Sequence, residues 1–163
     1  MRDAFAGIWS AAASLLGVAV FAIIIWAITK SHFHMWRLAS TRYQMRKEAP
    51  ALGRKLETIV ITHRASGPFE GDARYRQYAG TIVAVTGRGL RLSLIPIPPL
   101  NIMAPALFLP FDEMAIERTS WALWTEPFAL RMTNLPDIDI ILGRDTVQWI
   151  RSRTSEPPFG RDI

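Results

Sequence analysis

Three acidic side chains that lie close together in the sequence are the first candidates for chemistry. Asp112, Glu113 and Glu117 form the acid cluster of the chain, and paired carboxylates can exchange protons or hold a metal ion. No neighbouring nucleophile or base completes such a site. We expect instead that these side chains are solvated and protect the edge of a strand. The sequence therefore predicts no catalytic residue and a protein that is not an enzyme.

A pair of histidines is the second candidate, for metal binding. His32 and His34 have only His63 as a further imidazole in the chain. Side chains two positions apart on a helix point about 200° away from each other, so one ion could not easily take both. The chain has no cysteine, which excludes disulfides and thiolate sites. We therefore predict neither a metal nor a cofactor.

Arginines in one long loop are candidates for binding phosphate. Arg64, Arg74 and Arg76 flank the first long connection between predicted strands. Arg74 and Arg76 alternate on one strand, so both guanidiniums would point to one face and could grip a phosphate. Glu70 and Asp72 compete for the same charges. This competition favours a surface salt-bridge face, with lipid headgroup binding as the alternative.

The formal net charge of +5 is concentrated in a short segment. Between residues 30 and 47 there are five basic residues and no acidic one: Lys30, Arg37, Arg42, Arg46 and Lys47. From residue 49 to the end, 13 basic and 12 acidic residues nearly cancel. Anionic lipid headgroups attract each such cation by about 1 kcal/mol. We therefore expect this segment to contact membrane lipid, and we expect no nucleic-acid partner.

The segment before these charges is apolar enough to be a membrane anchor. Residues 4–29 are 26 consecutive uncharged residues, and about 20 suffice to cross the hydrocarbon core. Trp9 and Trp26 lie 17 residues apart, about 25 Å along a helix, as expected for rings at the two interfaces. A cleaved signal peptide would have a shorter core and a cleavage site, whereas Lys30 follows directly. We predict a transmembrane helix over residues 1–29.

The charges on either side of this helix predict its orientation. Only Arg2, offset by Asp3, precedes the apolar segment, and five basic residues follow it. Basic residues are enriched on the cytoplasmic side of membrane spans. We therefore predict a single-pass protein of a bacterial inner membrane with its C-terminal domain in the cytoplasm.

Small residues recur along the predicted anchor at spacings of three and four. They are Gly7, Ser10, Ala11, Ser14 and Gly17. This spacing gathers them into one stripe, and such stripes let two membrane helices approach closely. The stripe is either a docking face for a second helix, from another copy or a protein partner, or the ordinary Ala and Ser content of a mildly apolar helix.

Residues 30–49 are expected to form a basic collar next to the membrane. Phe33, Trp36 and Tyr43 alternate here with the basic residues, so the segment would lie in the headgroup layer with its rings inserted. The charges do not gather on one side of a helical wheel. A helix that continues into the cytosol is therefore the alternative.

The remaining chain has the pattern of an antiparallel β-domain, predicted over residues 50–153 with a flexible tail over 154–163. Runs rich in β-branched or alternating apolar residues, bounded by turn formers, predict seven strands at 56–63, 78–86, 90–94, 106–109, 114–123, 127–133 and 138–142. Residues 145–151 have the acidic start and basic end of a closing helix. This order resembles that of a pleckstrin-homology-like domain, which implies a seven-stranded sandwich or partial barrel closed by a C-terminal helix.

Three sequence elements carry a second resemblance. They are a W-R-L-A run at residues 36–39 followed by Tyr43, a G-L-R-L-S strand at 89–93 and a proline-bounded apolar segment at 104–111. These elements resemble a bacterial family of small uncharacterised proteins with W-x-x-L-A-x-x-Y, G-L-x-L-S and P-P-L-x-I-P-W elements. The resemblance covers about residues 36–150 and implies no activity.

An apolar loop joins two of the predicted strands. Residues 92–111 are uncharged, but five prolines within them exclude an ordinary second membrane helix. The tip of the loop would present Ile97, Leu100, Ile102 and Met103. It is either a surface that inserts into lipid or a partner's groove, or a loop folded over the end of the barrel.

These features together predict a non-enzymatic, membrane-anchored interaction module, for example an accessory subunit of a membrane complex. Its partners would be membrane lipid and either a membrane protein or a second copy of the chain. The alternative is a sensor of anionic lipid headgroups at the cytoplasmic face of the membrane.

Overall fold

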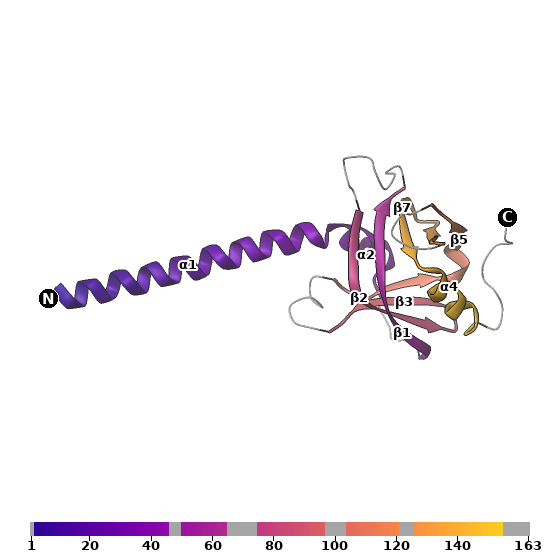
Figure 1. Cartoon of the computed structure of the whole chain (residues 1–163), viewed down its shortest axis with the longest axis horizontal. Helices are drawn as coiled ribbons and strands as arrows, with labels where there is room; N and C mark the ends of the chain where they lie inside the picture. Colours follow the sequence, from indigo (N-terminus) through magenta and orange to yellow (C-terminus); the bar gives the residue numbers. More distant parts are fainter. Residues whose placement is uncertain (1, 46–49, 65–74, 97–103, 121–125, 155–163) are drawn as a thin grey trace. The chain divides into compact units, whose positions relative to one another are not determined.

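The computed structural model describes residues 2–45, 50–64, 75–96, 104–120 and 126–154, with the backbone alone over 2–14. The chain divides into two compact units, Met1–Phe33 and His34–Ile163. The second unit thus begins sixteen residues before the domain boundary expected at residue 50. Figure 1 shows the helix of the first unit and the β-rich second unit.

Helix α1 (Arg2–His32) is the only secondary-structure element of the first unit. Its ten large apolar side chains from Leu15 to Ile28 are between 47% and 72% exposed. The stretch Leu15–His32 has a mean hydropathy of 1.8 and no buried residue. Within the described residues it is the one helix long and apolar enough to cross a membrane, as the sequence predicts.

Helix α2 (His34–Tyr43) opens the second unit and is two-sided. Met35, Trp36, Ala39 and Tyr43 are buried on one side, at the spacing of three to four residues that a helix face requires. His34, Arg37 and Arg42 are exposed. The segment expected to be a basic collar is therefore, in large part, a helix of the β-domain.

Seven antiparallel strands form one sheet in the order β4-β3-β2-β1-β7-β6-β5. The strands are β1 (Ala51–His63), β2 (Tyr75–Thr86), β3 (Gly89–Leu94), β4 (Leu107–Pro110), β5 (Met114–Arg118), β6 (Phe128–Met132) and β7 (Leu135–Leu142). A short 3-10 turn, η1 (Phe111–Glu113), joins β4 to β5. This architecture confirms the predicted seven-stranded domain, whereas the pleckstrin-homology likeness stays a prediction.

The core of the domain follows the period of two expected of strands with one buried face. On β3, Leu90, Leu92 and Leu94 are buried, while Arg91 and Ser93 point to the other face. The turn into β3 requires Gly89, because a Cβ there would come within 2.3 Å of the Leu109 carbonyl oxygen. Antiparallel β2 and β3 are thus joined by a tight turn at Gly87 and Arg88.

Helix α4 (Arg144–Arg151) closes the domain against β1, and buries Thr146, Val147 and Ile150. Its N-cap is Gly143, without a side-chain capping bond, so Asp145 lies in the first turn and is not the cap. Lys55 Nζ donates a hydrogen bond of 2.9 Å to Thr146 Oγ1, and that hydroxyl donates to Glu57. These contacts join α4 to the middle of β1.

Candidate functional site

Trp36 attaches α2 to the sheet. Its side chain is fully buried, and its indole Nε1 donates a 2.8 Å hydrogen bond to the Pro105 carbonyl. Its backbone N–H donates to the Tyr78 hydroxyl at 3.2 Å, and the two rings meet edge to face with centroids 5.2 Å apart. Burial raises the pKa of Tyr78 to about 12, against opposing effects from the Trp36 N–H and Arg76. The phenol is thus neutral at physiological pH.

Tyr43 attaches the other end of α2. Its hydroxyl donates to Glu113 Oε2 at 2.6 Å and accepts from the Asn134 backbone N–H at 3.2 Å. The Asn134 side-chain amide donates to the same carboxylate oxygen at 2.6 Å. Burial, then the hydrogen bond to Glu113, raises the pKa of Tyr43. Glu113, a member of the predicted acid cluster, therefore has a structural role.

The chain continues from α2 along the edge of the sheet. Gln44 forms an isolated bridge with Leu107, and the Met45 N–H donates to the Ala106 carbonyl at 2.9 Å. The indole of Trp36 and the phenol of Tyr43 are enclosed by protein, so these rings do not insert into lipid as expected. The exposed side of α2 carries Arg37 and Arg42, which have no ion-pair partner among the described residues.

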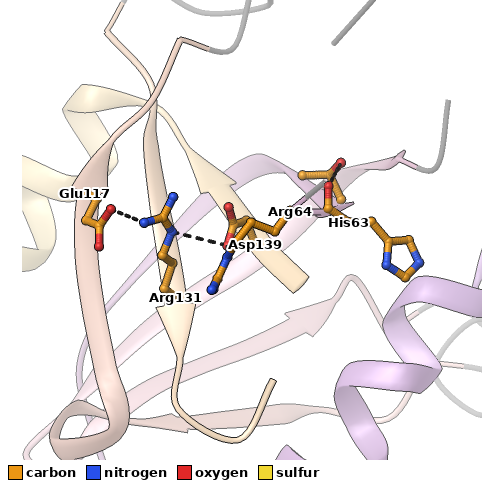
Figure 2. Close-up of polar contacts among 6 residues, drawn as sticks. His63, Arg64, Glu117, Arg131 and Asp139 are labelled. Carbon is orange, nitrogen blue, oxygen red and sulfur yellow. Dashed lines mark hydrogen bonds and ion pairs between the residues drawn. The ribbon is translucent and has the colours of Figure 1, made fainter. Parts of the chain in front are cut away.

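A chain of charges crosses the face of β7, β6 and β5, as Figure 2 shows. Asp139 is 9% exposed at its side chain, and its Oδ1 accepts from Arg64 Nε at 3.0 Å. Arg131 Nε lies 3.5 Å from the same oxygen, and Arg131 Nη1 pairs with Glu117. A carboxylate thus compensates Arg64, which favours the salt-bridge interpretation of this residue over headgroup binding.

Two of the other predicted lipid-contacting residues, Arg76 and Lys30, have described contacts. Arg76 Nη1 donates to the Tyr75 carbonyl at 2.9 Å. In α1, Lys30 Nζ lies 4.8 Å from the centroid of the Trp26 ring, a cation–π contact. Arg46, Lys47 and Arg74 lie outside the described residues.

Two further predictions fall mostly outside the described part of the chain. Of the small-residue stripe, only Gly17 has described surroundings, and a Cβ there would meet nothing within 4 Å. The side chains of Gly7, Ser10, Ala11 and Ser14 lie outside it. So does the tip of the apolar loop, with Ile97, Leu100, Ile102 and Met103.

The structure has a hollow on the outer face of the β1–β4 part of the sheet that the sequence did not predict. Its volume is about 340 Å³, and among the described residues Arg54 and Arg91 are the charged ones that line it. The alternation of Arg91 and Ser93 with buried leucines placed both on the outer face of β3. The sequence did not predict that Arg54 lies beside Arg91 and Ser93, because this position depends on the register of β1 against β2.

Two carboxylates of the acid cluster take part in contacts within the domain. Glu113 accepts from Tyr43 of α2 and Glu117 pairs with Arg131, whereas Asp112 is exposed. No three His, Asp or Glu side chains in the described ranges gather as metal ligands would. Arg37 and Arg42 on α2 and Arg54 beside the hollow are exposed, and Arg91 is half-buried. No family model and no curated protein matches this chain.

Proposed function

We propose that this chain is a non-enzymatic interaction module, tethered by α1 as a single pass in a bacterial inner membrane, with its β-domain in the cytoplasm. The observation that carries the proposal is the exposure of α1: no residue of Leu15–His32 is buried within the protein. Leaving a large apolar side chain in water costs about 1.5–3 kcal/mol relative to burying it. Such a helix therefore needs lipid or another protein around it.

The domain supports the tethering role because it starts immediately after the anchor. Phe33 alone separates α1 from α2 in the chain, and α2 is attached at both ends by Trp36 and Tyr43. A folded domain joined by so short a connection stays within reach of the membrane surface. The exposed Arg37 and Arg42 agree with a cytoplasmic domain, where basic residues are enriched.

Affinity isolation of the full chain from membranes solubilised in mild detergent tests the interaction role. We expect a stoichiometric membrane protein, or a second copy of the chain, to be isolated with it. Gly17→Leu should weaken this association, because a bulky side chain separates packed helices. Val18→Leu is the matched control. Recovery of the chain alone and monomeric, from preparations in which labile complexes survive, would contradict the proposal.

A second candidate function, sensing of anionic lipid, is favoured by Arg37 and Arg42, whose guanidiniums are uncompensated among the described residues. A fluorophore attached at Thr41→Cys, on the exposed side of α2, reports the polarity around the helix in reconstituted vesicles. Anionic vesicles should change its emission relative to neutral ones, and salt should reverse the change. Arg37→Gln with Arg42→Gln should remove the response, while Arg88→Gln should not. An equal response from the double variant of Arg37 and Arg42 and from Arg88→Gln would exclude lipid sensing.

A further inference from the structure

The hollow on the sheet has walls of two kinds. The charged wall comes from Arg54 on β1 and Arg91 on β3, and the space between them exists because the intervening residue is Ala84. Ala104 and Ala106 are further small residues of the lining. These small side chains leave a volume of about 340 Å³, which falls in the size range of small-molecule sites.

The sheet register brings the two arginines to one side. Ala84 pairs with Arg54 across β1–β2 and with Arg91 across β2–β3. Directly paired residues project to the same face, and the strands are about 4.8 Å apart, so the two arginine Cα atoms are about 10 Å apart. Two long side chains at this separation can converge on one ligand between them. Arg91 is positioned by β3, whose leucines are fixed in the core.

The next row of the sheet adds a hydroxyl and an apolar side chain. Ser93 pairs with Ile82, and both line the hollow. Among the described residues, the lining thus combines two guanidiniums, one hydroxyl and an apolar floor, without a carboxylate. Guanidiniums bind phosphate oxygens in a bidentate way and remain charged at any physiological pH. The apolar floor would accept the carbon part of the same ligand.

We propose that this hollow binds the phosphate group of a small phosphoester, with Arg54 and Arg91 on the phosphate, Ser93 beside it and the ester carbons over Ile82. The phosphate is that of a soluble metabolite or of a lipid headgroup, since both present the same oxygens. This site is distinct from α1 and from the exposed arginines of α2. It therefore adds a ligand to the proposed interaction module.

Binding is tested with the full chain in dodecyl maltoside, by calorimetric titration. The probes are inorganic phosphate, glycerol 3-phosphate and dihexanoyl phosphatidic acid below its micelle concentration, with dihexanoyl phosphatidylcholine as the zwitterionic comparison. Binding of glycerol 3-phosphate would indicate a soluble phosphoester. Binding of dihexanoyl phosphatidic acid alone would indicate a lipid headgroup. Both results support the site.

Matched variants separate this site from general attraction of anions. Arg54→Gln and Arg91→Gln should each weaken binding at least tenfold, while Arg88→Gln, which removes an exposed guanidinium from the turn between β2 and β3, should leave it unchanged. Ala106→Leu fills the space without changing charge and should also weaken binding. Because Arg54 is exposed, Arg54→Gln tests the site even where Arg91→Gln unfolds the domain. Unchanged affinity in Arg54→Gln and Ala106→Leu, or no binding of any phosphate probe to the folded chain, would overturn the proposal.

Discussion

Helices α1 and α2 are neighbours in the chain, but they differ in burial. The described side chains of α1 are not buried, whereas one side of α2 is buried. Trp26 on α1 is 55% exposed, whereas Trp36 on α2 is fully buried. In the described part of helix α1, no residue of Leu15–His32 is buried. Helix α2 has four buried residues on one side and arginines on the other.

The difference shows what an apolar residue needs in order to stabilise a structure. Trp36 has the Tyr78 ring, the Pro105 carbonyl and the sheet as specific partners, so its burial contributes to the folding of one domain. The apolar residues of α1 have no such partners in the described structure. The free energy of exposing these side chains therefore depends on whether water or lipid surrounds the helix. Such a helix is long and apolar enough to span a lipid bilayer.

The largest effect should come from charging α1. Val20→Lys with Ile24→Lys places two cations on one side of the span, and each costs about 2.5–3.5 kcal/mol near the centre of a membrane helix. The fraction of the chain that resists carbonate extraction should fall to near zero. Ser31→Lys, beyond the apolar stretch, should remain in the membrane pellet. Full membrane retention of the double variant would contradict the interpretation of α1 as the membrane span.

The two tryptophans form a matched pair for stability. Trp36→Ala should lower the free energy of unfolding of the domain by about 3–5 kcal/mol, because it leaves a cavity and removes the indole donor of the Pro105 carbonyl. Trp26→Ala should leave the same free energy unchanged. The measurement is urea unfolding of the full chain in detergent, followed by circular dichroism in the β-sheet region. Equal effects of the two substitutions would contradict the separation of the helices into two units.

The titration of Tyr78 tests how α2 is attached to the sheet, because the Tyr78 hydroxyl accepts from the Trp36 N–H. Its pKa is about 12 in the folded domain and 10.0 in the reference state, so its stabilising contribution is complete below pH 10 and is lost as the pH rises toward 12. Each unit of difference between the folded and reference pKa values contributes about 1.4 kcal/mol to the free energy of unfolding. The free energy of unfolding should therefore fall over this range.

Tyr78→Phe is the control for that titration. The variant keeps the ring but removes the ionisable hydroxyl, so its unfolding free energy should depend less on pH between 10 and 12. At neutral pH it should be less stable by roughly 1–3 kcal/mol, because the Trp36 N–H loses its acceptor. An identical pH dependence in both proteins would show that Tyr78 is not the titrating group.

A smaller effect is expected from the charges in Figure 2. Asp139→Asn removes the carboxylate shared by Arg64 and Arg131, whose side chains are 37% and 34% exposed. Because water partly compensates both guanidiniums, we expect a loss of roughly 1–2 kcal/mol in unfolding free energy. Glu117→Gln, at a position 50% exposed, should cost less than about 1 kcal/mol. A larger loss for Glu117→Gln than for Asp139→Asn would reverse the order that burial predicts.

The sequence predicted the elements whose signals are local. Continuous apolar residues predicted α1, and the alternation of leucines with Arg91 and Ser93 predicted β3 and its buried face. Residues 36–43 were harder to interpret, although Trp36, Ala39 and Tyr43 have helical spacing. The partners that bury them, Tyr78 and Pro105, lie 42 and 69 positions beyond Trp36, and no local pattern encodes such contacts.

The candidate sites were harder still to predict, because they depend on register. Arg64 meets Asp139, 75 positions away, through the pairing of β1 with β7. Arg54 and Arg91 face one hollow only because both pair with Ala84. A shift of one residue in either pairing would place the two arginines on opposite faces.

Accessibility of single cysteines to a membrane-impermeant maleimide tests the central claim most directly. The chain has no cysteine of its own, so Asp3→Cys and Gln148→Cys, the latter at an exposed position of α4, each carry a single thiol. With α1 spanning the membrane and the β-domain in the cytoplasm, Asp3→Cys should be labelled in intact spheroplasts and Gln148→Cys only after permeabilisation. Labelling of both thiols, or of neither, in intact spheroplasts would contradict a single span, and labelling of Gln148→Cys alone would reverse the orientation.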